Sequence, residues 1–303
     1  MRRAIILVSL AAALLGLPIR AAQAQQPAPT QLTVAIYAPA VPFADSGARL
    51  AYAQGIAKAI QTQTGIPTTG KAFVRYGDMA AAKPDFAILD GQCIAAGRGG
   101  NVLAIASVGG DTQQAYGLYV AAGISLPALQ GKKLAFVKMD CRDSDFLDNA
   151  MFESEVKTAK FFGALVDKPD LAGAVAAVAA YKAADAVFAP ASQAKGLTKL
   201  FDAGSVPNAG FVTLNKSIDA ALESRVGAAV LAYGGGGAID GWRVSSGYGG
   251  LTGRMGQRTR KPLFAQPETV RLEDLDVVAP PKSAYDLGSV RHHFWQPPAV
   301  LQP

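Results

Sequence analysis

The 303-residue sequence has only two cysteines and two histidines, and only 17% of its residues are charged. Two cysteines form at most one disulfide, which excludes a disulfide-stabilised scaffold. Both histidines, His292 and His293, lie near the C-terminus, so no histidine in the body of the chain is available to activate a nucleophile. The glycine run 234–237 lacks the lysine and hydroxyl residue of a phosphate-binding loop. These absences argue against an enzyme, and no cofactor or metal is expected.

The sequence also lacks an apolar run of the ~20 residues that a membrane-spanning helix needs. Residues 1–24 instead combine Arg2 and Arg3 with an apolar core and a small-residue ending at Ala24, as in a secretory signal peptide. We therefore expect export to the periplasm and cleavage near Ala24. Cleavage removes Arg2, Arg3 and Arg20. The mature chain then has 26 of the 29 basic residues and all 23 acidic ones, a net charge of +3. This charge gives no reason to expect a nucleic-acid partner.

Apolar runs of strand length alternate with segments of helical pattern along most of the chain. The alternation predicts an α/β sandwich with mostly parallel sheets. Strands are expected at residues 32–37, 71–75, 84–91, 102–108, 116–121, 134–137, 184–188 and 210–213. Helices are expected at 47–64, from about 78, at 92–96, 144–157, 171–180, from Ser192 through Leu200, and at 217–232.

The segment 131–152 gives the strongest indication of a ligand site. An apolar strand, 134–137, leads into a polar turn, 139–143, and Asp143 or Ser144 then begins a helix. Strand, polar turn and helix N-terminus together place side chains and backbone N–H groups at the carboxyl edge of a parallel sheet, where ligands are held.

Four segments, in order, carry a resemblance to a known family: PDFAILDGQCIAA, LPALQGKKLAFVKMD, VDKPDLAGAVAAVAAYKAADAVFAP and GAIDGWRVSSGYGGL. They resemble the phosphonate/phosphate-binding group of type II periplasmic solute-binding proteins, which serve ABC importers. The resemblance covers roughly residues 31–251. It implies two α/β lobes joined by two crossing strands, near residues 113–116 and 204–208, which close over a ligand. The implied partners are a small-molecule ligand and the membrane subunits of an ABC transporter, with the binding protein as a monomer.

The same resemblance implies a division of the chain. Lobe one is expected at 31–114 plus 207–251, lobe two at 115–206, and a proline-rich extension at 252–303. A tail of this kind either wraps over a lobe, with 270–278 as one strand, or docks a partner. An alternative function is therefore an envelope signalling or assembly adaptor that uses the same clamp and docks a partner through its tail.

Placing the family's ligand site on this chain gives ten candidate residues at the edge turns: Tyr37, Phe43, Asp90, Gln92, Asp140, Cys141, Arg142, Asp143, Ser144 and Ser192. The family has a serine- and threonine-rich anion nest where this chain has 140–144. Asp140 and Asp143 would repel a dianion, so phosphonate specificity is not expected. Arg142 either binds a ligand carboxylate or pairs with the neighbouring aspartates.

By this assignment Cys93 follows the edge turn of lobe one and Cys141 lies in the edge turn of lobe two, so the two residues face one cleft from opposite sides. Three interpretations remain open: a disulfide that locks the closed clamp, a buried apolar Cys93, or two thiols that bind a soft metal such as copper(I). A permanent bond is disfavoured because a transport clamp must open to release its ligand. A nucleophilic Cys141 thiol is also conceivable, although no base lies nearby in the sequence.

Overall fold

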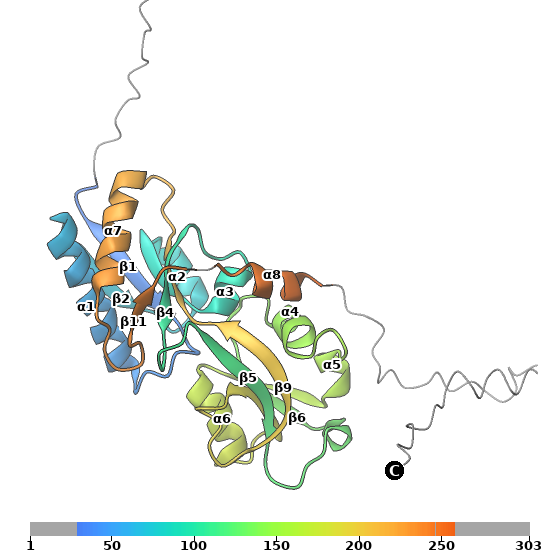
Figure 1. Ribbon diagram of the computed structural model, residues 1–303. Coiled ribbons are helices and arrows are strands. Elements are labelled where there is room, and N and C mark those ends of the chain that lie inside the picture. The colour runs from blue at the N-terminus through green and yellow to red at the C-terminus, as the bar shows by residue number, and fades with distance from the viewer. Residues whose placement is uncertain (1–28, 246, 258–303) are drawn as a thin grey trace, which may run out of the picture.

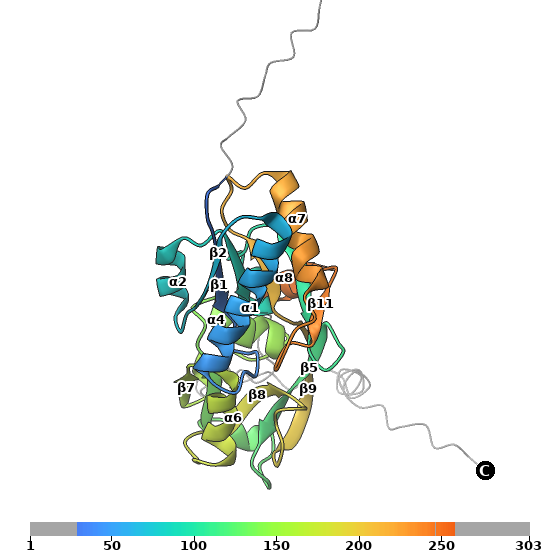
Figure 2. The same ribbon diagram turned by 90° about the vertical axis from the view of Figure 1, so that its left-hand side faces the viewer.

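The computed structural model describes residues 29–245 and 247–257 of the chain (Figure 1). These residues form two α/β lobes, each built on one β-sheet, and Figures 1 and 2 show one lobe above the other. The predicted signal peptide and the possible strand at 270–278 lie outside the described residues. None of the described helices has the length and apolar character that crossing a membrane requires.

Lobe one contains a six-stranded sheet in the order β11-β4-β10-β3-β1-β2. Its strands are β1 (Leu32–Tyr37), β2 (Thr68–Ala72), β3 (Phe86–Leu89), β4 (Val102–Ser107), β10 (Gly210–Thr213) and β11 (Gly241–Arg243). Its helices are α1 (Ser46–Thr64), α2 (Tyr76–Ala82), α3 (Gly91–Ala95) and α7 (Ala220–Ala232). The Asp45 carboxylate caps α1 by accepting from the Ala48 N–H at 2.7 Å, and Gly65 ends it with a left-handed φ of 73°.

Lobe two contains a five-stranded sheet in the order β7-β6-β8-β5-β9. Its strands are β5 (Gln113–Val120), β6 (Lys133–Val137), β7 (Ala164–Lys168), β8 (Ala186–Pro190) and β9 (Thr198–Pro207). Its helical segments are the 3₁₀ turn η1 (Pro127–Leu129), α4 (Asp143–Asp145), the π-helix η2 (Phe146–Met151), α5 (Thr158–Phe161) and α6 (Leu171–Ala179). Asp170 caps α6 through the Gly173 N–H at 2.7 Å.

The expectation of mostly parallel sheets is wrong. In lobe one, β1 pairs in parallel with β2 and β3, whereas β10 and β11 pair antiparallel with their neighbours. In lobe two, β6 is parallel to β7 and β8, but β5 is antiparallel to β8 and β9. The physical reason is the connection between lobes, because strands that cross and return must run in opposite directions.

The crossing strands are β5 and β9, which pair antiparallel from Gln113↔Pro207 to Val120↔Thr198. The predicted helix from Ser192 through Leu200 is therefore wrong. A turn containing Gly196, with φ 78°, leads directly into β9. The ladder of eight residue pairs with β5 provides tertiary pairing that overrides the local helical pattern.

A third segment joins the lobes through α8 (Gly249–Gly256), which packs against both α3 and η2 (Figure 1). The Arg254 guanidinium donates to the carbonyls of Ala150, at 3.2 Å, and Ala203, at 3.3 Å. This helix spans residue 252, where the proline-rich extension was predicted to begin. The C-terminal segment therefore belongs to the folded body at least to residue 257.

The predicted helix 144–157 is also shorter than expected. It ends at Met151 as a π-helix, and Glu153 and Ser154 then take left-handed φ angles of 50° and 66°. The buried Asp148 carboxylate accepts from the Thr158 N–H at 2.9 Å and so stabilises the turn that ends the helix.

Candidate functional site

The polar turns at the carboxyl edges of the two sheets meet beside a cavity, and both contribute to its lining. The turn after β3 contains Asp90 and leads into α3, and the turn after β6 leads through 138–142 into α4. Gly91 allows the first turn to approach β9 closely, because a side chain there would collide with the Pro207 carbonyl. The site is thus built where both lobes meet the crossing strands.

The cavity draws its lining from both lobes and from both crossing strands. Its volume of about 70 Å³ has room for a handful of waters or a small ligand, since one water requires about 10–15 Å³. Its lining residues are Ala40, Val41, Pro42, Asp90, Gly91, Gln92, Val108, Gln114, Tyr116, Phe136, Val137, Met139, Asp143, Phe146, Leu147, Leu171, Phe188, Pro190, Gln193, Val206, Pro207, Asn208 and Ala209.

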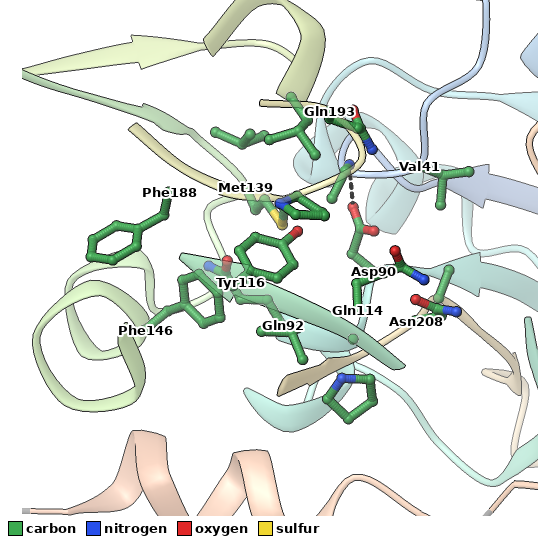
Figure 3. Close-up of a pocket in the computed structure, with 18 of the residues that line it drawn as sticks. Val41, Asp90, Gln92, Gln114, Tyr116, Met139, Phe146, Phe188, Gln193 and Asn208 are labelled. Atoms are coloured by element: carbon green, nitrogen blue, oxygen red, sulfur yellow. Dashed lines mark hydrogen bonds between the residues drawn. The ribbon is translucent and has the colours of Figure 1, made fainter. Parts of the chain in front are cut away.

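Asp90 is the most perturbed acid of this cavity. It is only 4% exposed, and its Oδ2 accepts a hydrogen bond from the Ala40 N–H at 2.9 Å (Figure 3). Burial raises the pKa of Asp90 to about 7, although the Ala40 N–H and the charge of Arg49 oppose the shift. A carboxyl group that changes charge near neutral pH therefore lies at the cavity wall.

Three amide side chains of the lining donate their NH₂ groups to the protein itself. Gln92 donates to the Cys141 carbonyl at 3.2 Å and to Asp143 Oδ1 at 2.6 Å. Gln114 donates to the Val108 carbonyl at 3.0 Å. Asn208 donates to the carbonyls of Ala106, at 3.0 Å, and Asp111, at 2.7 Å.

The fourth amide of the lining belongs to Gln193, which Figure 3 also labels. In the described part of the chain, all side-chain hydrogen bonds of the other three amides are donated by nitrogen. The amide oxygens are consequently the polar atoms that these three groups can present to a ligand.

Asp143 has a different environment from Asp90. Its Oδ2 accepts from the backbone N–H groups of Met139, at 3.1 Å, and Asp140, at 3.0 Å, and its Oδ1 accepts from Cys141 N–H at 3.3 Å. Burial raises the pKa of Asp143, and these N–H groups and the Gln92 amide oppose that shift. The side chain therefore occupies the N–H groups that would otherwise form an anion nest.

The two cysteines form a disulfide that joins the lobes. The Cα atoms of Cys93 and Cys141 are 4.9 Å apart, and both residues are fully buried. Our preference against a permanent bond is therefore wrong, because the edge turns approach closely enough for the bond to form. The two alternatives that required free thiols, a soft-metal site and a Cys141 nucleophile, do not apply to this disulfide-bonded state.

Comparison with known proteins gives no match by sequence but several matches by structure. No family profile and no curated protein matches the sequence. Solved structures do match: a Xanthomonas citri protein bound to ATP has a TM-score of 0.57 and 13% identity, over 75% of this chain and 97% of that one. The binding-protein component of an ABC phosphonate transporter from Pseudomonas aeruginosa has a TM-score of 0.56 and 14% identity, over 87% and 97%.

A third match is PhnD1 from Prochlorococcus marinus, solved with methylphosphonate, with a TM-score of 0.54 and 12% identity over 74% of this chain and 97% of that one. The fold is that of the type II periplasmic solute-binding proteins. The structural similarity establishes the two-lobed α/β fold, whereas sequence identities of 12–14% do not identify the ligand.

Within this type II fold, three of the ten predicted site residues line the cavity: Asp90, Gln92 and Asp143. Tyr37 lies beneath it, where it is 2% exposed and donates its hydroxyl to the Met139 carbonyl at 3.1 Å. Phe43 packs against Tyr52, with ring centroids 5.6 Å apart.

The other five predicted residues, Asp140, Cys141, Arg142, Ser144 and Ser192, also lie outside the lining. Cys141 is bonded to Cys93, and Arg142 pairs with Asp145 at 2.7 Å. Asp140, Ser144 and Ser192 are exposed. A ligand contact by any of these five residues stays a prediction.

Sequence reasoning missed the lining that comes from the crossing strands and the aromatic wall. Gln114 and Tyr116 lie on β5, Asn208 follows β9, and Phe146 and Phe188 come from η2 and β8. The crossings near 113–116 and 204–208 were the available signal, because a strand that passes between two lobes necessarily borders the space between them. The aromatic residues follow ordinary core patterns and give no local signal.

Proposed function

We propose that this protein is an exported solute-binding protein that holds one small molecule between its lobes and delivers it to an ABC importer. The observation that carries the proposal is the inter-lobe cavity, which both lobes and both crossing strands line. Structures of the same fold include the binding component of a phosphonate transporter, which supports the role without naming the ligand.

The disulfide adds a condition to this function. A ligand that contacts both lobes favours their closed arrangement, and release follows when the lobes separate. The Cys93–Cys141 bond ties the two edge turns together, so a hinge motion that parts these turns requires its reduction. The oxidised protein is then a closed binding state, and the reduced protein is the state that opens fully.

Native mass spectrometry of the mature, oxidised protein tests the binding function. We expect a bound mass of a small molecule that is lost on denaturation. The ligand-free mass alone, in preparations from several growth media, would count against the proposal. N-terminal sequencing of the secreted protein should start near Gln25, and a mature form that retains Met1 would overturn export with cleavage.

The second candidate is an envelope adaptor that uses the clamp as a rigid body. The observation that favours it is the number of links that hold the lobes together: β5, β9, α8 and the disulfide. Small-angle scattering with and without dithiothreitol separates the two functions. A transport clamp expands on reduction and contracts again with ligand, whereas an adaptor keeps the same radius of gyration in both states.

A further inference from the structure

We propose that the cavity binds a compact organic cation, an ammonium group that lies against Asp90 within an aromatic wall. This inference rests on the proposed function, because it names the ligand class of the same cavity. Among residues 29–245 and 247–257, no lysine or arginine lines the cavity, whereas two carboxyl groups, Asp90 and Asp143, do.

Acceptors predominate in the polar lining: the Tyr116 hydroxyl and the Gln193 amide can donate, whereas the two carboxyl groups and the other three amides present oxygens. Gln92, Gln114 and Asn208 use their NH₂ groups within the protein, and their oxygens accept. Within the described part of the chain, the Asp90 carboxylate has one hydrogen bond to the protein, from Ala40 N–H. A ligand that donates or carries positive charge would satisfy these oxygens, whereas an anion would find no partner among them.

The opposite wall is aromatic. Phe146, Phe188 and Tyr116 lie on one side in Figure 3, and Asp90 and Asn208 lie on the other, with Tyr116 nearest the polar side. The negatively charged ring faces of aromatic residues attract ammonium groups, and rings that surround a quaternary ammonium bind it through this attraction. A cation between these walls is therefore stabilised from both directions.

The Tyr37 hydroxyl lies close to more negative than positive side chains. The charges of Asp90, Asp140 and Asp143 all raise the pKa of the Tyr37 hydroxyl, after the larger effect of its burial. Arg49 opposes them, but it is not part of the lining; its guanidinium carbon lies 6.0 Å from the Phe43 ring centre. Three carboxylates and one guanidinium thus act on this hydroxyl.

Asp143 explains why an anion is excluded at the turn after β6. Its carboxylate already accepts from the N–H groups of Met139, Asp140 and Cys141. A phosphonate at the same N–H groups would have to displace this side chain and would then be repelled by it. The residue therefore sets the charge selectivity of the cavity.

Isothermal titration calorimetry with three compounds of similar size tests the proposal: tetramethylammonium, neutral tert-butanol and anionic methylphosphonate. The measurements use the mature protein at pH 8, freed of any co-purifying ligand by dialysis in dithiothreitol and titrated both in the reduced state and after reoxidation. We expect tetramethylammonium to bind at least tenfold more tightly than tert-butanol, and methylphosphonate to show no saturable heat. Tight methylphosphonate binding, or equal affinities for the cation and the alcohol, would overturn the proposal.

The pH profile gives a second measurement. The charged and titratable groups that act on Asp90 or feel its charge are Arg49, Tyr37, Tyr116 and Tyr248. The tyrosine pKa values are all raised, so these groups stay neutral below pH 9. Affinity for tetramethylammonium should fall roughly 30-fold from pH 8 to pH 5.5, because a carboxyl with a pKa of about 7 loses its charge over that range.

Two variants complete the test. Asp90→Asn should lose at least tenfold in affinity at pH 8 and show a much smaller pH dependence than the parent, whereas Asp145→Asn, outside the lining, should bind as the parent does. Parent-like binding by Asp90→Asn would overturn the proposal. If none of the three compounds binds, the cation class is wrong, and a bound mass in native mass spectrometry would still support the solute-binding function.

Discussion

Asp90 and Asp143 occupy matching places in the two lobes, yet their surroundings differ. Each lies after an interior strand, β3 or β6, at the carboxyl edge of its sheet, each begins or precedes a helix, and each borders the cavity. Asp143 accepts three backbone N–H groups and one amide, whereas Asp90 accepts one N–H. Asp143 therefore stabilises its own turn, and Asp90 is available to a ligand. Equivalent positions in a two-lobed fold therefore need not have equivalent roles.

The disulfide connects these two turns, so its removal gives the largest expected effect. Replacing both cysteines, Cys93→Ser with Cys141→Ser, frees a loop with a sequence separation of 48 residues. Loop-closure entropy predicts a loss of about 4 kcal/mol in the free energy of unfolding, and native-state adjustments place most such losses at about 2–4 kcal/mol.

Urea denaturation of the double variant, beside oxidised and reduced parent protein, measures this loss. The reduced parent should match the double variant, and dithiothreitol should leave the variant unchanged. A double variant as stable as the oxidised parent would show that the lobe contacts alone hold the turns together.

Asp143→Ala tests the first half of the comparison. Removing the carboxylate leaves the N–H groups of Met139, Asp140 and Cys141 without their acceptor, and an unsatisfied buried donor costs about 1–3 kcal/mol. Because water reaches part of this turn, we expect a total loss of about 2–3 kcal/mol in urea denaturation.

Asp145→Ala is the matched control, since among the residues that the structure describes Asp145 pairs only with the exposed Arg142 side chain. Exposed ion pairs contribute less than about 1 kcal/mol. Equal losses in the two alanine variants would show that Asp143 does not stabilise the turn more than an ordinary surface carboxylate does.

Asp90→Asn tests the second half and should have the opposite sign. Burial raises the folded-state pKa of Asp90 to about 7, far above its value in the unfolded chain. The neutral form is therefore favoured by folding, and the stability it provides is lost as pH rises from about 4 to 7. An asparagine never ionises, so the variant should gain on the parent across this window, by roughly 1–3 kcal/mol at pH 8.

Thermal unfolding of parent and variant at several pH values between 4 and 8 checks this prediction. The variant should be more stable at pH 8 and nearly equal at pH 4. Curves that run parallel at all pH values would show that Asp90 ionises as freely in the folded protein as in the unfolded chain.

The same two turns show what sequence can and cannot predict. The turns, their carboxylates and their two cysteines follow from strand-to-helix patterns, because apolar runs and capping residues are local signals. The hydrogen-bond partners of each carboxylate cannot be predicted from such local patterns. The N–H groups around Asp143 converge because Asp140 and Arg142 both have a left-handed φ angle of 56°.

The two-lobed architecture could be predicted because four segments resemble a known family in the same order along the chain. The directions of the strands and the start of β9 could not be predicted in this way. Strand β9 forms because β5 pairs with it along the full length of β9. The local sequence of residues 193–200 does not indicate this pairing. The aromatic wall likewise depends on which core positions of lobe two end up facing lobe one. Distant pairing decides these features, and a single sequence does not show it.

The smallest expected effect concerns Arg142, whose two predicted roles were a ligand contact and an ion pair. Its Nε lies 2.7 Å from Asp145 Oδ2, and its side chain is 43% exposed, so the pair contributes less than about 1 kcal/mol. Its φ of 56° costs a non-glycine residue about 1 kcal/mol. Arg142→Ala should lose a few tenths of a kcal/mol, because it breaks the pair and keeps the strained φ.

Arg142→Gly removes the pair and the strain together, so it should match or slightly exceed the parent in urea denaturation. Both variants should bind tetramethylammonium as the parent does, since Arg142 lies outside the cavity lining. Loss of binding in both would assign Arg142 to the ligand after all. Loss in the alanine variant alone would instead show that the turn geometry set by this φ angle positions the carboxylates of the cavity.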